Sequence, residues 1–257
     1  MCDICGCSES KSGHASHEGA GHGSEGSRGT TLAVHESLLA ANDREAAHNR
    51  EHFDAHGVLA VNLMSSPGSG KTSLLESTID ALGRRLRIAV IEGDLETEND
   101  ARRIRAKGVP AVQITTGSAC HLDARMVHHA LHEIDLDAVD LLFIENVGNL
   151  VCPASFDLGQ HRNVTLLSVT EGDDKPAKYP VMFRKSDLVL LSKSDLLDVL
   201  DDFDPEAATR HLRTLASQVP VLRVSARRPA SLRGWIDWLE QEYQQRRALW
   251  RRTAVAL

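Results

Sequence analysis

The chain has 257 residues and a formal net charge of −7 at neutral pH. This length allows one large domain or two small ones at roughly 150 residues per domain, and the acidic balance argues against general nucleic-acid binding, which usually needs a basic surface. The apolar runs are far shorter than the roughly 18 residues that a membrane-spanning helix needs, and the start of the chain lacks the pattern of a signal peptide. We therefore expect a cytoplasmic protein that binds neither nucleic acid nor membrane.

The beginning of the chain differs in composition from the rest. Residues 1–31 contain three cysteines within the first seven positions, followed by a stretch of mostly Gly, Ser, His and Glu. Such a stretch cannot bury enough apolar surface to offset its chain entropy, so we expect a flexible, metal-binding tail. Residues 32–56 are rich in alanine and predict a helical lead-in, and residues 57–257 are expected to form the main domain.

Apolar runs alternate with helical patterns after residue 57. Several runs are almost continuously hydrophobic, as is typical of parallel strands that are covered on both faces. The strands are expected at 58–64, 87–91, 111–115, 140–144, 164–169, 188–191 and 221–224, and the helices at 72–82, 97–107, 122–132, 205–217 and 232–252. This alternation predicts an α/β fold with a doubly wound, mostly parallel sheet.

A phosphate-binding loop is predicted at residues 65–72, which read Ser-Ser-Pro-Gly-Ser-Gly-Lys-Thr between an expected strand and an expected helix. In such a loop the backbone N–H groups surround phosphate oxygens, Lys71 reaches the β- and γ-phosphates, and the Thr72 hydroxyl binds Mg²⁺. Ser65 replaces the usual first glycine, and the alternative is a glycine-rich turn with an exposed lysine. The expected nucleotide-binding residues of this loop are Gly68, Ser69, Gly70, Lys71, Thr72 and Ser73.

Acidic residues follow two other expected strands. Asp94 ends the sequence Glu-Gly-Asp, and Glu145 begins the sequence Glu-Asn-Val-Gly, whose Gly148 N–H could contact a γ-phosphate. Lone acidic residues at strand ends are common, but together with the phosphate loop they indicate a magnesium site. We expect Thr72, Asp94 and Glu145 to bind Mg²⁺, and Lys71, Asp94 and Glu145 to support catalysis.

Two short segments favour guanine over adenine. Residues 192–195, Ser-Lys-Ser-Asp, follow an expected strand and resemble the Asn/Thr-Lys-x-Asp element of GTPases, in which the aspartate accepts two hydrogen bonds from guanine. Adenine offers no such pair of donors, so a site of this kind discriminates against ATP. The expected base-binding residues are Lys193, Asp195, Ser225 and Ala226, and the alternative is a charged surface loop.

Two clusters of sulfur and nitrogen atoms are candidate metal sites. Cys2, Cys5 and Cys7 lie close to the terminal amine, a set that suits Ni²⁺ or Zn²⁺. Cys120, His121 and Cys152 follow two expected strands and could meet near the nucleotide, with a water or a second subunit completing the shell. Buried cysteines are often only small apolar residues, and the histidines of the tail could be either a metal reservoir or a solvated spacer.

The segments 62–72, 92–94, 117–123, 145–153 and 168–176, which read NLMSSPGSGKT, EGD, GSACHLD, ENVGNLVCP and SVTEGDDKP, resemble the HypB family of hydrogenase nickel incorporation proteins. The resemblance covers about residues 35–245. It implies a P-loop GTPase that forms a homodimer and uses GTP, Mg²⁺ and Ni²⁺, with Zn²⁺ as a further metal. The implied function is delivery of nickel to the large subunit of [NiFe]-hydrogenase, with the metallochaperone HypA as a partner.

The resemblance also implies ligand sets. Cys2, Cys5 and Cys7 would form a nickel site, and Cys120, His121 and Cys152 would bind nickel or zinc near a dimer interface. Because Cys152 follows residues 145–148 closely, GTP hydrolysis could reposition a metal ligand. The alternatives are a urease-type nickel GTPase, a P-loop kinase for small molecules, and a nickel storage or buffering protein.

Overall fold

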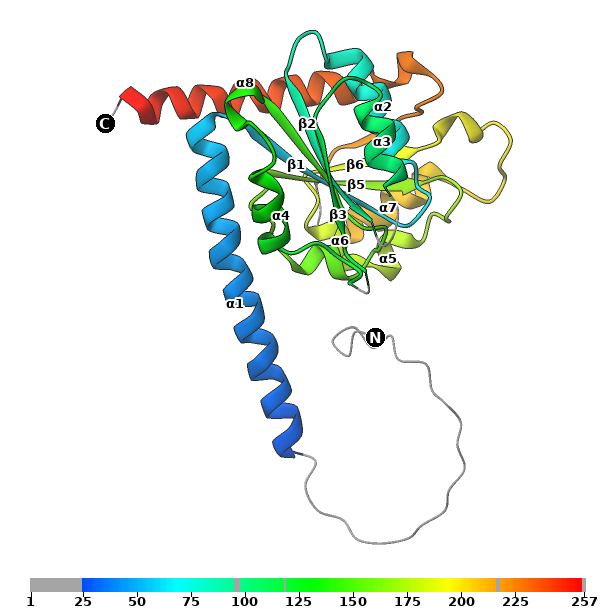
Figure 1. Cartoon of the computed structure of the whole chain (residues 1–257). Coiled ribbons are helices and arrows are strands. Elements are labelled where there is room, and N and C mark those ends of the chain that lie inside the picture. Colours follow the sequence, from blue (N-terminus) through cyan, green and yellow to red (C-terminus); the bar gives the residue numbers. More distant parts are fainter. Residues whose placement is uncertain (1–24, 95–97, 118, 216–217, 256–257) are drawn as a thin grey trace, which may run out of the picture.

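The computed structural model describes residues 25–94, 98–117, 119–215 and 218–255. Cys2, Cys5 and Cys7, with the rest of the expected tail up to residue 24, lie outside the described residues. The described chain forms a central sheet that is flanked by helices on both faces, with the first helix packed along one side (Figure 1).

The sheet has seven parallel strands in the order β3-β2-β4-β1-β5-β6-β7, which confirms the predicted fold class. All seven expected strands are present, each within a few residues of its predicted bounds. The strands are β1 (Leu59–Ser65), β2 (Ile88–Asp94), β3 (Ala111–Thr115), β4 (Leu141–Glu145), β5 (Arg162–Ser168), β6 (Leu188–Ser192) and β7 (Val221–Arg223).

The helices also follow the expected order, with two differences. The first begins at Glu25 rather than at residue 32, and two short helices, α5 and α6, lie between β5 and β6 where none was expected. Both are shorter than two turns and therefore show no helical hydrophobic period. The helices are α1 (Glu25–His56), α2 (Lys71–Leu82), α3 (Asn99–Arg105), α4 (Ala124–Leu131), α5 (Lys175–Lys178), α6 (Pro180–Arg184), α7 (Pro205–Thr214) and α8 (Arg233–Val255).

Alternate residues of the strands build the two sides of the core. On β1, Leu59, Val61 and Leu63 face the layer formed by α2, α3 and α8, in which Trp235 is fully buried. Ala60 faces the opposite layer, where α1 and α4 pack. A further apolar cluster joins β5 and β6 to α6 and α7. Because successive strand residues point to opposite faces, continuous apolar runs fill both layers.

The carboxylate of Asp54, near the end of α1, connects three distant segments. One of its oxygens, Oδ1, accepts hydrogen bonds from Arg246 Nη2 at 2.6 Å and from Trp250 Nε1 at 2.7 Å, both on α8. The same oxygen lies 3.1 Å from Nε2 of His161, just before β5. These contacts place the end of α1 against the C-terminal half of α8 (Figure 1).

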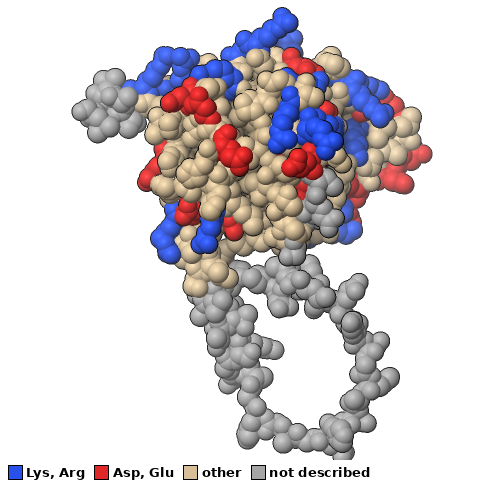
Figure 2. All heavy atoms as spheres, viewed as in Figure 1, with Lys and Arg blue, Asp and Glu red and all other residues tan. Residues whose placement is uncertain are grey.

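The surface of the described residues carries charges of both signs. Lys and Arg are interspersed with Asp and Glu on the face shown in Figure 2. No helix among the described residues combines the length and the apolar character that spanning a bilayer requires.

Candidate functional site

The loop between β1 and α2 has the backbone shape that its glycines allow. Gly68 and Gly70 have φ angles of +72° and +92°, and an added Cβ would meet nothing within 4 Å at either position. Glycine is therefore favoured there by backbone conformation rather than by space. The Lys71 ammonium, largely buried, donates to Ser65 Oγ at 3.0 Å. Ser65, at the position of the usual first glycine, thus holds the lysine in place.

A glutamate from another loop fastens the phosphate loop. The hydroxyls of Ser66 and Ser69 each donate to the carboxylate of Glu171 at 2.5 Å. Glu171 follows β5 and belongs to the segment 168–176 that carries part of the family resemblance. Glu171 was not predicted as a site residue, because nothing in the sequence indicates which loop packs on the phosphate loop.

Two buried glutamates lie side by side behind this loop. Glu92 of β2 and Glu145 of β4 are paired in register, and both side chains are buried. Thr72 Oγ1 donates to Glu145 Oε1 at 2.9 Å, whereas Oε2 of each glutamate has no hydrogen-bond partner. Burial, together with the charge of Glu145, raises the pKa of Glu92 to about 12. Burial also raises the pKa of Glu145, which the neighbouring Lys71 opposes.

This donor set fits Mg²⁺, which prefers carboxylate and hydroxyl oxygens and would satisfy the two orphaned oxygen atoms. The predicted magnesium residues Thr72, Asp94 and Glu145 all line one cavity of about 410 Å³, together with Lys71. Glu92 lines the same cavity and was missed by the sequence analysis. Side chains alternate between the two faces of a strand, so Glu92 lies on the same face of β2 as Ile88 and Val90, which pack on the side of α2. This alternation could have placed Glu92 near the phosphate loop.

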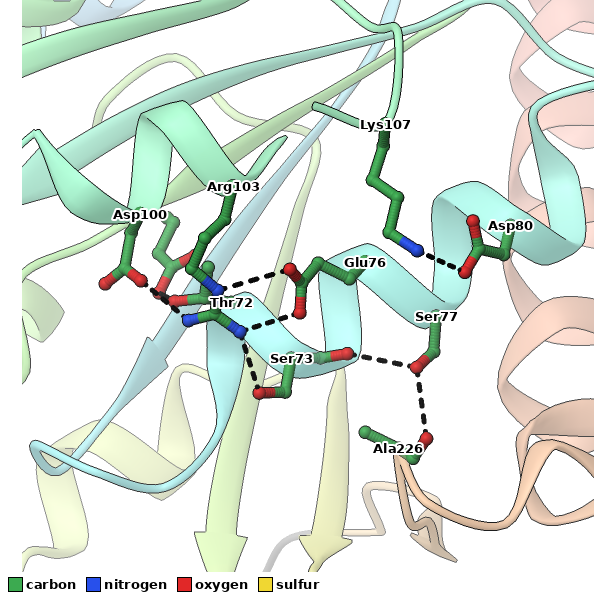
Figure 3. Close-up of polar contacts among 10 residues, drawn as sticks. Thr72, Ser73, Glu76, Ser77, Asp80, Asp100, Arg103, Lys107 and Ala226 are labelled. Carbon is green, nitrogen blue, oxygen red and sulfur yellow. Dashed lines mark hydrogen bonds and ion pairs between the residues drawn. The ribbon is translucent and has the colours of Figure 1, made fainter. Parts of the chain in front are cut away.

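Helix α3 is held against α2 beside this cavity by one arginine. Arg103 donates to Glu76 Oε2 at 2.6 Å, to Asp100 Oδ1 at 2.8 Å and to Ser73 Oγ at 3.2 Å (Figure 3). Ser73, expected to bind nucleotide, therefore presents its hydroxyl to Arg103. Farther along α2, the Ser77 hydroxyl donates a hydrogen bond to the carbonyl oxygen of Ala226 at 3.2 Å. This bond joins α2 to the loop that carries the predicted guanine-binding residues Ser225 and Ala226.

Gly148 lies directly against the phosphate loop. A Cβ on Gly148 would come within 2.7 Å of the Pro67 Cα and 2.8 Å of its nitrogen. Only glycine lets the segment after β4 approach the loop this closely. Gly148 therefore lies beside the predicted phosphate-binding loop, and its contact with a γ-phosphate stays a prediction.

The expected base-binding residues line a neighbouring cavity of about 350 Å³, which also borders Gly70 and Ser73. Ser225 Oγ donates to Asp195 Oδ1 at 2.6 Å, and this bond holds the pKa of Asp195 below its ordinary value. The carboxylate is therefore ionised and positioned to accept hydrogen bonds. Lys193 adopts a left-handed conformation with φ of +55°. Ser192 donates to the Ser69 carbonyl at 2.7 Å, so it ties β6 to the phosphate loop.

The predicted sulfur and imidazole ligands lie together. Cys120 Sγ is 3.2 Å from Cys152 Sγ and 3.8 Å from His121 Nδ1, and neither cysteine is part of a disulfide. Two sulfurs on one ion at about 2.3 Å each can be no more than about 4.6 Å apart, so these distances fit a shared ion. Burial lowers the pKa of His121, which leaves the neutral imidazole that a metal requires. His121 also stacks on Phe156, which orients its ring.

The segment between Glu145 and Cys152 contacts both the phosphate loop and the residues around Cys120. The side chain of Asn146, which is buried, accepts a hydrogen bond from Leu122 N at 3.2 Å, next to His121. Asn149 Nδ2 donates to the Cys120 carbonyl at 3.4 Å. Gly148, between them, abuts the phosphate loop. A displacement of this segment would therefore reach the metal cluster and the phosphate loop together.

Known proteins resemble this chain over most of its length. Residues 59–223 match the family described as CobW/HypB/UreG, nucleotide-binding domain. The chain is 56% identical over 216 residues to the hydrogenase maturation factor HypB of Azotobacter vinelandii, which covers 84% of this chain and 71% of that protein. It is 48% identical over 230 residues to the hydrogenase maturation factor HypB of Escherichia coli K12, covering 89% of this chain and 79% of that protein.

A solved structure shares the fold. The crystal structure of HypB from Helicobacter pylori in complex with nickel superimposes with a TM-score of 0.77 and is 43% identical, covering 80% of this chain and 96% of that one.

Proposed function

Because the chain belongs to the HypB group of the CobW/HypB/UreG family of nucleotide-binding proteins, we propose that it hydrolyses GTP and delivers nickel to the large subunit of a [NiFe]-hydrogenase. The observation that carries this proposal is the contact of residues 145–152 with both the phosphate loop and the Cys120–Cys152 cluster. A nucleotide cavity and a soft-metal cluster are thereby joined by one short segment.

The nucleotide roles follow from the donors that line each cavity. Backbone N–H groups around Gly68–Gly70 and the Lys71 ammonium would surround the β- and γ-phosphates, where negative charge must be stabilised during transfer. Asp195 would accept hydrogen bonds from guanine, with Lys193, Ser225 and Ala226 enclosing the base. We assign the residues that line the two cavities as the nucleotide site: Gly68, Ser69, Gly70, Lys71, Thr72, Ser73, Gly148, Lys193, Asp195, Ser225 and Ala226.

The proposed reaction is attack of water on the γ-phosphorus, which releases GDP and inorganic phosphate. Thr72, Asp94 and Glu145 would hold Mg²⁺, and the ion would neutralise negative charge on the phosphate oxygens. Lys71 is positioned by Ser65 to stabilise charge on the same oxygens. Glu92 lies beside Glu145 on the neighbouring strand and would add a second carboxyl group next to the Mg²⁺ ligands.

Nickel is the cargo rather than a participant in hydrolysis. Cys120, His121 and Cys152 supply three ligands, one fewer than a closed tetrahedral site needs. We propose that a second copy of the chain or a water completes the shell, and that Zn²⁺ competes for the same ligands. Cys2, Cys5 and Cys7 would form a separate nickel site. The proposed partners are a second subunit, the HypA metallochaperone and the hydrogenase large subunit.

Coupling between the two sites is the mechanism that we propose. If loss of the γ-phosphate moves residues 145–148, the attached Cys152 moves relative to Cys120 and the nickel affinity changes. By thermodynamic linkage, nickel must then change the relative affinity for GTP and GDP by the same factor. Hydrolysis would in this way time the release of nickel.

The test measures nickel affinity in a chain with Cys2, Cys5 and Cys7 replaced by serine, so that the proposed nickel site of these three cysteines is removed. Affinity is measured with GDP and with a non-hydrolysable GTP analogue, and we expect a difference of about 5-fold or more. Cys152→Ser serves as the variant in which the difference disappears. Equal nickel affinities in the two nucleotide states would reject the coupling.

Hydrolysis and storage are separated by a second experiment. Lys71→Ala should abolish GTP turnover and hydrogenase maturation while nickel binding to the cysteines persists. A Lys71→Ala protein that still supports full maturation would instead favour nickel storage or buffering.

A further inference from the structure

A second group of potential metal ligands lies away from the cysteines. His48 and His52 on α1 and His128 on α4 each bring one ring nitrogen within 4.8 Å of the others. Their ring centroids are 4.6 Å apart for His48–His52, 5.0 Å for His48–His128 and 5.7 Å for His52–His128. Two nitrogens that bind one ion at the usual distance of about 2.0 to 2.1 Å are at most about 4.2 Å apart. Small rotations of these side chains would therefore bring all three nitrogens to a shared ion.

The helical spacing explains how two of the ligands meet. His48 and His52 are four residues apart, so they lie on the same face of α1 one turn from each other. Helix α4 packs against this face of α1, and His128 near its middle completes the group. Such a site forms only when the two helices are docked.

Asn49 fixes the orientation of His128. The Asn49 side chain is fully buried, and its Nδ2 donates to the carbonyl of Ala124 at 2.8 Å and to that of Leu158 at 3.2 Å. Its Oδ1 therefore faces His128 Nδ1, 3.1 Å away, and can only accept a hydrogen bond. His128 Nδ1 must carry the proton, which leaves the lone pair on Nε2.

This arrangement is what a histidine ligand needs. Metal-binding histidines usually donate their second ring N–H to an oxygen, which fixes the tautomer and the ring orientation. The Glu45 carboxylate, 3.9 Å from His128 Nδ1, adds negative charge beside the group.

We propose that His48, His52 and His128 bind a divalent first-row transition-metal ion, nickel or zinc, with a fourth position open to water. Three imidazoles form a nitrogen-only ligand set, which suits both ions and differs from the sulfur-rich Cys120 cluster. His48 is exposed and the other two are partly exposed, so the ion can exchange with solvent. The bound ion would fasten α1 to α4, whose start directly follows His121 and its neighbours.

The experiment uses the full chain with all five cysteines replaced by serine, without nucleotide, so that its outcome is independent of the proposed GTP coupling. Zinc and nickel are titrated in competition with a chromophoric chelator to give stoichiometry and affinity. The variants are His48→Ala, His52→Ala and His128→Ala, and the control is His129→Ala. His129 is exposed, neighbours His128 on α4 and lines a different cavity.

Each of the three variants should lose about 10-fold or more in affinity for one equivalent of metal, whereas His129→Ala should bind like the parent chain. Metal should also raise the melting temperature of the parent and of His129→Ala but not of His128→Ala. His52→Ala on α1 gives the same readout if His128→Ala disturbs the packing of α4. The proposal is overturned if the three variants bind metal with the stoichiometry and affinity of His129→Ala.

Discussion

Glu92 and Glu145 lie opposite each other on the neighbouring strands β2 and β4, and both side chains are buried beside Lys71. Each has a carboxylate oxygen without a hydrogen-bond partner. Two carboxylates in such a site cannot both be ionised at low cost without a cation. The pair therefore stores a destabilisation that a bound divalent ion would remove.

Glu92→Gln should stabilise the protein when nucleotide and magnesium are absent. The pKa of Glu92 is raised to about 12, above its ordinary value, so in the unfolded chain the carboxyl is ionised at pH 7 whereas in the folded protein it must hold a proton. The folded state therefore binds one more proton than the unfolded state above about pH 4.5. The contribution of Glu92 to the free energy of unfolding is thus fully present at acid pH and is lost as the pH rises above this value. We expect urea unfolding at pH 7 to show a gain of about 1 to 3 kcal/mol for the variant.

The same variant should respond less to magnesium. The stabilisation that Mg²⁺ and GTP confer on the parent protein should be smaller in Glu92→Gln, because the variant lacks the second buried carboxyl group whose ionisation the cation would favour. An unchanged or lower stability of the metal-free variant would contradict this interpretation of the buried pair.

Asp195→Asn should weaken guanine binding and admit xanthine. The ionised carboxylate that Ser225 orients accepts two hydrogen bonds from guanine, whereas an amide offers one donor and one acceptor. Loss of these charge-assisted bonds should reduce GTP affinity about 100-fold, and xanthosine nucleotides should gain affinity because their C2 carbonyl matches the amide donor. Displacement of a fluorescent GDP measures both, with the exposed Asp198→Asn as control. Equal GTP affinity in the two variants would remove Asp195 from the base site.

Gly148→Ala should impair nucleotide binding without unfolding the sheet. Its Cβ would lie 2.7 Å from the Pro67 backbone, so either the phosphate loop or the segment after β4 must shift. We expect GTP affinity to fall by about 10-fold or more, on the scale of 1.4 kcal/mol per factor of ten. The matched control is Gly234→Ala, where the Cβ would meet Leu222 at an ordinary 3.6 Å. Equal nucleotide affinities for the two alanine variants would show that the close contact has no role.

His161 should make the protein sensitive to mild acid. Burial, with the charge of Arg246, lowers the pKa of His161 to about 4, so the unfolded chain binds a proton near the ordinary value of 6.5 and the folded chain does not. The unfolded state thus binds more protons between pH 6.5 and 4, and stability falls as pH falls through this window. The loss between pH 7 and 5 should be about 2 kcal/mol.

His161→Gln tests this assignment, because glutamine can accept from the Ala60 N–H and donate to Asp54 without titrating. Urea unfolding at pH 7 and pH 5 should show a smaller acid loss in the variant than in the parent. His121 and His128 also have lowered pKa values and contribute in the same direction in both proteins. Identical pH dependence in parent and variant would rule out His161 as the source.

The fold was predictable because short stretches of sequence, such as apolar runs and helix caps, determine its strands and helices. Apolar runs such as residues 141–144 are buried along their whole length, so hydrophobicity alone identified the strands. The cap of α7 was also readable, since Asp204 accepts from Glu206 N and Pro205 opens the helix. The start of α1 at Glu25 was not predictable, because residues 25–31, which read EGSRGTT, have little helical propensity of their own.

The grouping of the candidate site residues was predictable where one segment carries them or where two segments leave the same edge of the sheet, and not where it depends on strand register, a loop path or helix docking. The phosphate loop is continuous in sequence, and Cys120, His121 and Cys152 were expected to meet because both segments leave the same edge of the sheet. Glu92 depends on the register of β2 against β4, and Glu171 depends on the path of the loop after β5. The pairing of His128 with His48 and His52 depends on the docking of two helices, which the sequence does not specify.

The carboxylate of Asp54 makes the two ends of the domain depend on each other. Arg246 and Trp250, late in the chain, and His161, in its middle, all contact this one side chain on the first helix. Truncation before Trp250, or a bulky fusion at that position, would therefore remove contacts that hold the C-terminal end of α1 against the domain. The last turns of α8 are therefore needed to position the first helix, although the two segments lie at opposite ends of the sequence.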